Sequence, residues 1–371
     1  MMMAGSDDGA SGDQDAFTTE QLRLLVTCNR VAASISLISS LIIMKLAFRE
    51  RHRVFHRLML ATSVHSTLYA LWHIVGPAAI PADTPNTWGA RGTTASCDAQ
   101  GFGLQLSFCA PFYYAALSVY SFVAVCNNFQ VSKYAWVEKY IHIGVHIFPL
   151  GSAIYLLMIE AYNSNGNGAS CWIASIPIDC GEGSEIKCER GPQNIAKISF
   201  IFATFPGLCS VLVPLGAMIG LYVEVRRNQD RIRLAASSVA KQASLYLGAL
   251  FCSSIFSFIN NSLRWVQNRY FFPTTLLSTT MLTLFFFWVL LMYLCFRVKI
   301  GPDQIANPSE SPKPDDDERQ RNNAQELQTF NIFDGTNATG TLAEFVFDGD
   351  SEDEAADREE TERWQEIQDH V

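Results

Sequence analysis

The sequence predicts an all-α membrane protein: a seven-transmembrane helix bundle with its N-terminus outside and a disordered acidic C-terminal tail inside. Seven apolar stretches follow one another, and each reaches the roughly 20 residues that a helix needs to cross a bilayer. Hydrophobic residues make up 49% of the chain and charged residues only 17%. A helix satisfies its own backbone groups in lipid, whereas an open strand does not. We therefore read all seven stretches as membrane helices.

The chain divides into three parts by composition. We expect an extracellular segment at 1–21, a seven-transmembrane domain at 22–299 and a cytoplasmic tail at 300–371. The tail is strongly acidic, because residues 302–371 hold 20 Asp/Glu and 5 Lys/Arg. The polar N-terminus lacks the basic start and apolar core of a secretory signal, so the first helix is expected to insert by itself. The seven helices are expected at 22–48, 55–80, 99–126, 137–160, 194–225, 240–265 and 273–297.

The distribution of Lys and Arg between the loops predicts the orientation. Cytoplasmic loops of membrane proteins carry an excess of these residues. One set of connections is basic: Arg49, Arg51, Arg53, Arg57, Lys133, Lys139, Arg226, Arg227, Arg231, Arg233, Lys241, Arg297 and Lys299. The opposite face has fewer: Arg23, Arg91, Lys187, Arg190 and Arg269. The richer face is therefore expected inside, which puts the N-terminus outside.

Four cysteines fall in the predicted outside loops or at their edge, and none falls in an inside loop. An oxidising exterior favours disulfides there. Four cysteines allow three pairings. We favour Cys97–Cys171, which ties the third helix to the long loop 161–193, with Cys180–Cys188 closing a small ring. A loop held in this way would act as a lid over the bundle.

Several ionisable and aromatic residues lie near the outer ends of the predicted helices. An ionisable group inside a membrane is costly and suggests a functional site. The outer set can form one pocket whose cations favour a small anionic ligand. The alternative is that the cations reach the headgroups and the tryptophans form an interfacial belt, and for any single residue that alternative is favoured. The candidate ligand-binding residues are Trp72, His73, Glu160, Trp172, Lys197, Arg264 and Trp265.

Two histidines, His142 and His146, lie one helical turn apart and share a face. They could bind a metal, but no carboxylate or cysteine is near them in the sequence. We expect a packed or hydrogen-bonded role, with no metal and no cofactor. Pro206 and Pro214 interrupt the fifth helix and can bend it.

Short motifs in the membrane domain resemble those of G-protein-coupled receptors. A cysteine at the head of the third helix and another after the fourth accompany the seven helices. The triplet Cys171-Trp172-Ile173 looks like the second extracellular loop of cyclic-AMP-type chemoattractant receptors. The resemblance covers roughly residues 25–297. Further residues fall at spacings similar to that family: Tyr246, Phe256, Asn260, Phe272-Pro273 and Phe287-Trp288.

The chain departs from the rhodopsin-type pattern. Its third helix ends Val125-Cys126-Asn127-Asn128 instead of Asp-Arg-Tyr, and its seventh helix has no Asn-Pro-x-x-Tyr. The resemblance implies a plasma-membrane receptor that binds an extracellular ligand and activates a heterotrimeric G protein. Cyclic AMP is not carried over as the ligand, because Pro273 and Trp288 lie closer together than in that family.

The resemblance also assigns roles inside the cell. It implies that the short basic connection between the fifth and sixth helices meets the G protein through Arg226, Arg227, Arg231 and Arg233. The same charges attract anionic lipid. The acidic tail has serines at Ser309, Ser311 and Ser351, where phosphorylation would suit an arrestin-like or scaffold partner.

Two other functions remain open: a seven-helix transporter or channel, and a membrane scaffold that works through its tail. The predicted helix middles contain almost no carboxylates, which disfavours ion coupling. No catalytic motif is present, so we do not expect an enzyme. No nucleic-acid partner is expected.

Overall fold

The computed structural model describes residues 17–52, 54–85, 87–127, 136–164, 169–177, 180–181, 185–227, 248–263 and 271–298. Most of these residues are helical. Contacts within the chain separate Met1–Met292 from Tyr293–Val371. The described part of the second unit is the end of one helix, and the predicted tail at 300–371 lies outside the described residues.

Five helical stretches have the length and composition to cross a membrane. The first is α1 (Thr19–Arg49) and the fourth is α5 (Val137–Met158). The second joins α2 (Val54–Val75) to the short helix η1 (Gly76–Ala79). The third joins α3 (Thr94–Leu106) to α4 (Cys109–Cys126). The fifth joins α6 (Ile195–Ser199), the π-helical η3 (Phe200–Thr204) and α7 (Phe205–Arg227).

A sixth stretch is formed by α9 (Phe272–Thr283) and α10 (Phe285–Val298), which meet at a bend of 48°. Residues 248–263 form another helix, which falls inside the predicted helix at 240–265. The prediction of a helical body with several helices able to span a membrane is confirmed. Where the structure describes both ends of a predicted helix, each boundary falls within about five residues of its expected place; the predicted start at 240 and end at 265 lie outside the described residues.

Capping residues explain why two helices start earlier than predicted. Thr18 accepts a hydrogen bond from the backbone of Gln21, and the Gln21 side chain accepts one from the backbone of Thr18. Thr93 and Ser96 form the same reciprocal pair before α3. These capping boxes satisfy free N–H groups and extend the helices beyond their apolar cores.

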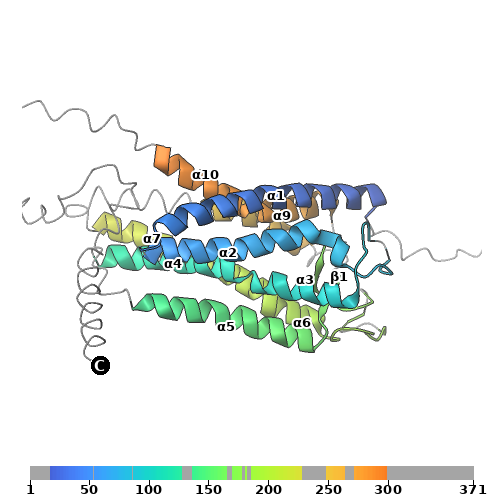
Figure 1. Cartoon of the computed structure of the whole chain (residues 1–371). Helices are drawn as coiled ribbons and strands as arrows, with labels where there is room; N and C mark the ends of the chain where they lie inside the picture. The colour runs from blue at the N-terminus through green and yellow to red at the C-terminus, as the bar shows by residue number, and fades with distance from the viewer. Residues whose placement is uncertain are drawn as a thin grey trace, which may run out of the picture. The chain divides into compact units, whose positions relative to one another are not determined.

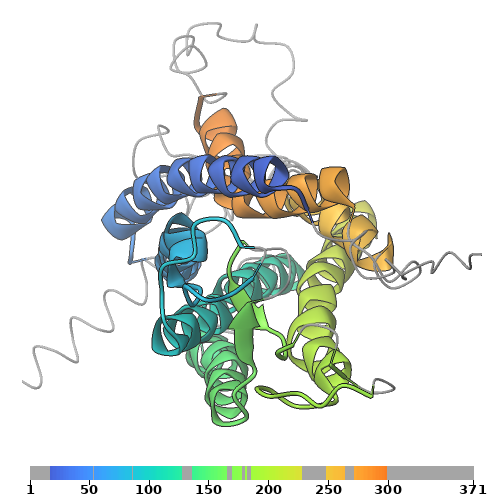
Figure 2. The ribbon, with the colours of Figure 1, turned by 90° about the vertical axis from the view of Figure 1, so that its right-hand side faces the viewer.

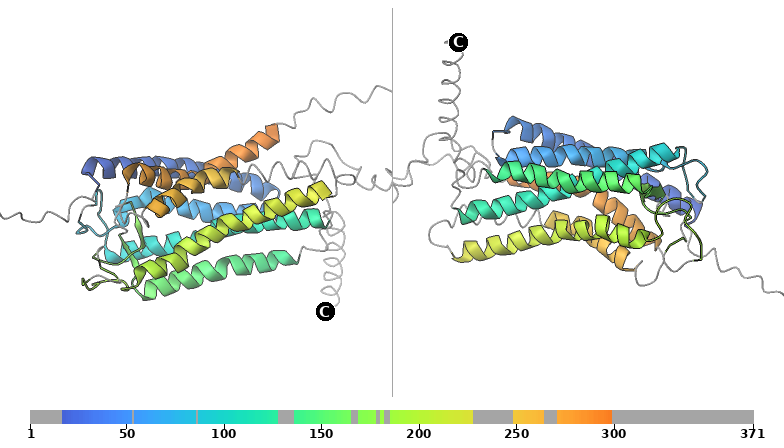
Figure 3. Two further views of the ribbon diagram at one scale, coloured as in Figure 1. Left: turned by 180° about the vertical axis from the view of Figure 1, so that it is seen from behind. Right: turned by 90° about the horizontal axis from the view of Figure 1, so that it is seen from below.

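The long helices pack side by side. Along the bundle, α1 packs on α2 and α9, α2 packs on α4, and α3 packs on α5 (Figure 1). Viewed from behind, α7 runs beside α4 (Figure 3). Many side chains on the outward faces are large and apolar, as expected for helices that face lipid.

One part of the all-α prediction needs correction. Residues predicted as loop form a small antiparallel hairpin, β1 (Tyr162–Ser164) with β2 (Cys171–Ile173), in which Tyr162 faces Ile173. The preceding α5 ends at Met158, and Glu160 has φ 55°. Glu160 therefore lies after the helix, not in its last turn as predicted. In the end-on view the hairpin lies across the end of the bundle (Figure 2).

Candidate functional site

The outer cap of the bundle is built around two disulfides. Cys97, at the start of α3, bonds to Cys171 in β2, and Cys180 bonds to Cys188 in the following loop. Both predicted pairings are confirmed. Cys97 and Cys171 are almost completely buried. The first disulfide therefore fixes the hairpin to the head of the third helix.

A buried glutamine one turn after Cys97 adds a second attachment. The Gln100 Oε1 atom accepts a 2.8 Å hydrogen bond from the backbone N–H of Cys171. Its Nε2 donates to the carbonyls of Trp72 (3.1 Å) and Gly76 (2.9 Å). One side chain thus connects α3, the hairpin and the end of α2.

An ion pair gives a third attachment. The Arg190 guanidinium lies 2.6 Å from a carboxylate oxygen of Asp98, the residue after Cys97. It also donates to the Tyr162 carbonyl at 3.1 Å and to the Asn163 side-chain oxygen at 2.9 Å. Burial, with a smaller contribution from the charge of Asp98, raises the pKa of the Tyr162 phenol well above its usual range.

A polar network lies within the bundle below this cap. The Thr283 hydroxyl donates to the Asn29 side-chain oxygen at 2.8 Å, and the Asn29 amide donates to Nδ1 of His73 at 3.1 Å. Asn29 is 2% exposed and Thr283 is 1% exposed. The network joins α1, α2 and α9 directly before Leu284, where the last stretch bends.

Buried side chains also satisfy carbonyls that prolines leave free. A proline within a helix cannot donate to the carbonyl four residues earlier. Pro206 leaves the carbonyl of Phe202 free, and Gln105 donates to it at 3.1 Å. Pro149 leaves the carbonyl of Val145 free, and the Cys109 thiol donates to it at 3.6 Å.

The predicted ligand residues lie in separate surroundings. His73 belongs to the polar network, while the indole of the adjacent Trp72 packs where Gly103 lacks a side chain. Trp172 stacks on Phe108 with ring centroids 5.9 Å apart. Glu160 and Lys197 are exposed. Arg264 and Trp265 lie outside the described residues. Their roles as ligand contacts remain predictions.

The predicted inner contact residues are only partly described. Arg226 and Arg227 lie in the last turn of α7, and Arg227 is exposed. Arg231 and Arg233 lie outside the described part of the chain, as do Ser309, Ser311 and Ser351. The same end of the bundle holds a bidentate pair in which Arg57 of α2 meets Glu138 of α5 at 2.6 and 2.7 Å.

Sequence reasoning missed Asn29, Gln100 and Gln105, the amides that hold the helices together. Each is a polar residue within an apolar stretch, and a buried amide of that kind needs a partner. The sequence shows each of these polar residues, but it does not show which group each one contacts. The partner of Gln100 is a backbone group 71 residues away, and the partner of Asn29 is 254 residues away.

One cavity of about 230 Å³ lies among α4, α5 and α7. Its lining is mostly apolar, and it is distinct from the outer cap. The lining residues are Phe112, Ala115, Gly144, Val145, Cys209, Ser210 and Val213.

No protein-family model matches this chain, and no curated protein shows significant similarity to it.

Proposed function

We propose that the chain is a seven-transmembrane receptor of the plasma membrane that transmits an extracellular signal to a heterotrimeric G protein. In this proposal residues 248–263 belong to the sixth span, and α9 with α10 forms the seventh. The count of seven is odd, so the N-terminus and the acidic tail lie on opposite sides. The Lys/Arg distribution puts the tail inside.

The observation that carries the proposal is the outer cap. Its disulfide Cys97–Cys171 joins the start of the third span to the loop after the fourth. Gln100 adds three hydrogen bonds to this cap, which link α3 to the hairpin and to the end of α2. Arg190 adds two more within the loop and an ion pair with Asp98 of α3. Disulfides persist in oxidising compartments. A disulfide-linked cap over one end of the bundle is therefore consistent with an extracellular end at which a ligand enters.

The polar network supplies an element that can respond to a ligand. Asn29, His73 and Thr283 join three helices next to the bend at Leu284. A ligand shifts a conformational equilibrium only through different affinities for its two states. In our proposal, ligand binding beneath the cap alters the packing of α9 against α1 and so changes the inner end of the bundle.

The inner contact falls on the connection between the fifth and sixth spans. We expect Arg226, Arg227, Arg231 and Arg233 to meet the G protein, with anionic lipid as a second partner. These cations can pair with an acidic surface of the G protein or with lipid headgroups. A G-protein activation assay distinguishes the two partners.

The test expresses the full chain in cells with a panel of G-protein subunits and measures basal G-protein activation. The variant changes all four arginines to Ala, at matched surface expression. The matched control removes cations from the opposite face, with Arg91→Ala and Lys187→Ala. We expect activation with at least one subunit, a loss in the four-arginine variant and no loss in the control. Equal activation in all three proteins would overturn the assignment of this contact.

An N-terminal epitope tag in the same cells reports the orientation. Antibody should stain it without permeabilisation, whereas a tag after Val371 should need permeabilisation. Staining of both tags from one side would contradict the seven-span count. Ion flux in place of G-protein activation would favour the transporter or channel.

A further inference from the structure

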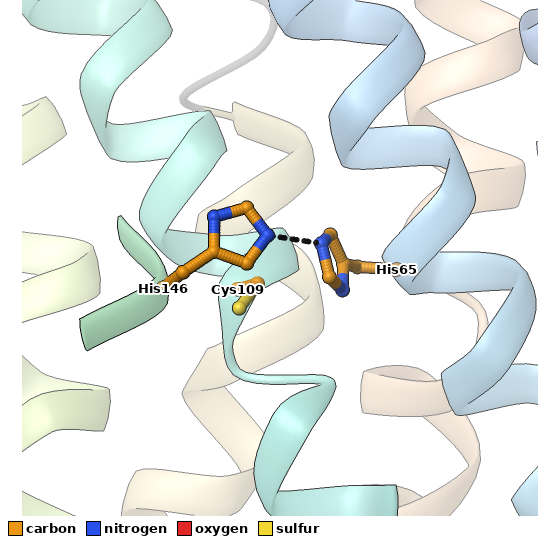
Figure 4. A group of neighbouring side chains, drawn as sticks. All are labelled: His65, Cys109 and His146. Atoms are coloured by element: carbon orange, nitrogen blue, oxygen red, sulfur yellow. Dashed lines mark hydrogen bonds between the residues drawn. The ribbon is translucent and has the colours of Figure 1, made fainter. Parts of the chain in front are cut away.

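Three potential metal ligands meet at mid-length of three helices, outside the cap and the polar network, with one of them on the exposed face of the bundle. They are His65 of α2, Cys109 of α4 and His146 of α5 (Figure 4). The two imidazole Nε2 atoms lie 3.2 Å apart, and all three ligand atoms lie within 4.8 Å of one another. Sequence spacing suggests His142 as the possible partner of His146, but it does not reveal Cys109, which is 37 residues from His146 along the chain.

Hydrogen bonding orients His146 toward such an ion. Its Nδ1 lies 2.7 Å from the backbone carbonyl of His142. A carbonyl only accepts, so Nδ1 carries the hydrogen and the neutral ring presents the lone pair of Nε2 toward His65. Metal-binding histidines in proteins usually donate their second nitrogen in this way, which fixes the tautomer.

The remaining ligands are also placed for coordination. Cys109 is 1% exposed and His65 is half-buried. The Nδ1 atom of His65 is buried and has no hydrogen-bond partner among the described residues. The second nitrogen of His65, Nε2, is the atom that faces His146. The thiol and the half-buried imidazole are costly to keep in lipid without strong partners, while His146 is exposed on the surface of the bundle, where an ion can reach the group.

We propose that His65, Cys109 and His146 bind a thiolate-binding first-row transition-metal ion, either Cu⁺ or Zn²⁺. With metal–nitrogen bonds of about 2.0–2.1 Å, two nitrogens of a trigonal or tetrahedral ion lie about 3.3–3.6 Å apart. The observed 3.2 Å is close to this range. The sulfur must move by roughly 1 Å, which a small side-chain rotation provides.

Binding exchanges a proton for the ion. The Cys109 S–H, which now donates to the Val145 carbonyl, loses its proton to solvent, and the thiolate bonds to the metal. A complex of Cu⁺ with one thiolate and two neutral imidazoles has no net charge, whereas Zn²⁺ leaves one positive charge. Because charge is costly in a low-dielectric interior, Cu⁺ is the favoured ion.

A bound ion would connect the second, third and fourth spans at mid-length. It would stabilise the arrangement in which α2, α4 and α5 pack as they do here, because a ligand that binds only one state stabilises that state. The site does not depend on the proposed receptor function.

The experiment uses the full chain purified in lipid nanodiscs. One arm titrates Cu⁺ against a competing chelator, and a second arm titrates Zn²⁺; each measures bound metal per chain and the melting temperature. We expect about one ion per chain in at least one arm, a metal-dependent rise in melting temperature, and at least a tenfold loss of affinity in His65→Ala, His146→Ala and Cys109→Ser.

Cys109→Ser separates metal binding from structure, because serine keeps a donor for the Val145 carbonyl but lacks the soft sulfur ligand. The matched controls are Cys126→Ser, a free cysteine at the far end of α4, and His142→Gln, which leaves the backbone carbonyl in place. Both should bind metal as the wild type does. No saturable binding of either ion by the wild type, or equal binding by Cys109→Ser, would overturn the proposal.

Discussion

The Thr283 hydroxyl donates a 2.8 Å hydrogen bond to the side-chain oxygen of Asn29, joining the last helical stretch to the first across 254 residues of sequence. Both side chains are buried. Asn29 also donates to His73, so one amide satisfies groups on two other helices. The Thr283 hydroxyl also lies 2.7 Å from the Thr279 carbonyl, so the bond to Asn29 links it across the bundle in addition to this local contact.

This relationship predicts coupling between the two residues. Asn29→Ala removes the hydrogen bonds to His73 and Thr283, and the lost pairing costs about 1–3 kcal/mol. Thr283→Val removes only the bond between Thr283 and Asn29 from this pair of bonds. A double-mutant cycle on melting in detergent should give a coupling of about 0.6–1.7 kcal/mol, as for hydrogen bonds between membrane helices. Additive effects would show that this hydrogen bond does not stabilise the bundle.

A close approach between α2 and α3 gives a second prediction. A Cβ atom at Gly103 would overlap the Trp72 indole, whereas one at Gly151 on α5 meets open space. Gly103→Ala should lower stability by about 1–3 kcal/mol, because the indole must move. Gly151→Ala is the control and should raise stability slightly, since alanine favours a helix by about 0.5–1 kcal/mol. Equal melting temperatures for the two variants would contradict the observed packing.

The two disulfides should contribute unequally. Cys97–Cys171 closes a loop of sequence separation 74, and Cys180–Cys188 closes one of 8. Loop-closure entropy gives roughly 4–5 kcal/mol for the first and roughly 2–3 kcal/mol for the second. Replacing both cysteines of a pair by Ser avoids free thiols.

We expect the Cys97/Cys171 replacement to lower the melting temperature and surface expression more than the Cys180/Cys188 replacement. The opposite order would show that the small ring, not the tie to α3, holds the cap.

The cap should also respond to alkaline pH through Tyr162. Burial raises the pKa of this phenol in the folded protein above its value of about 10 in the unfolded chain. A group with a raised folded pKa contributes stability that is fully present below the unfolded pKa and is lost as the pH rises above it. The melting temperature should therefore fall above about pH 10.

Tyr162→Phe is the matched control for this pH effect. It removes the titrating group and one 3.3 Å hydrogen bond to the Ala153 carbonyl, so it should cost little at neutral pH. Its melting temperature should fall less steeply than that of the wild type above pH 10. Parallel pH profiles would mean that Tyr162 does not titrate as its burial predicts.

Much of the fold could be predicted from the sequence, because membrane helices depend on local composition. Apolar length placed Thr19–Arg49 and Val137–Met158 to within a few residues. The oxidising exterior predicted that the four outside cysteines form disulfides, and the preference for a tie between the third helix and the long loop gave the observed pair Cys97–Cys171. What could not be predicted depends on contacts distant in the sequence, such as Gln100 with Cys171 and His65 with Cys109 and His146.

The predicted ligand-binding residues show most clearly what the sequence cannot predict. Trp72 and His73 are neighbours in sequence, but successive residues on a helix point about 100° apart. One packs at Gly103 and the other joins Asn29. Depth in the membrane follows from sequence position, whereas the direction of each side chain depends on how the helices pack.

The measurement that tests the central claim most directly is nucleotide exchange on purified heterotrimeric G proteins by the full chain in lipid nanodiscs. We predict that at least one class of G protein exchanges nucleotide faster than with empty nanodiscs. The variant with Arg226, Arg227, Arg231 and Arg233 changed to Ala should give no acceleration. Acceleration of no class by a chain with an intact Cys97–Cys171 disulfide, or equal acceleration by the variant, would contradict the proposed receptor mechanism.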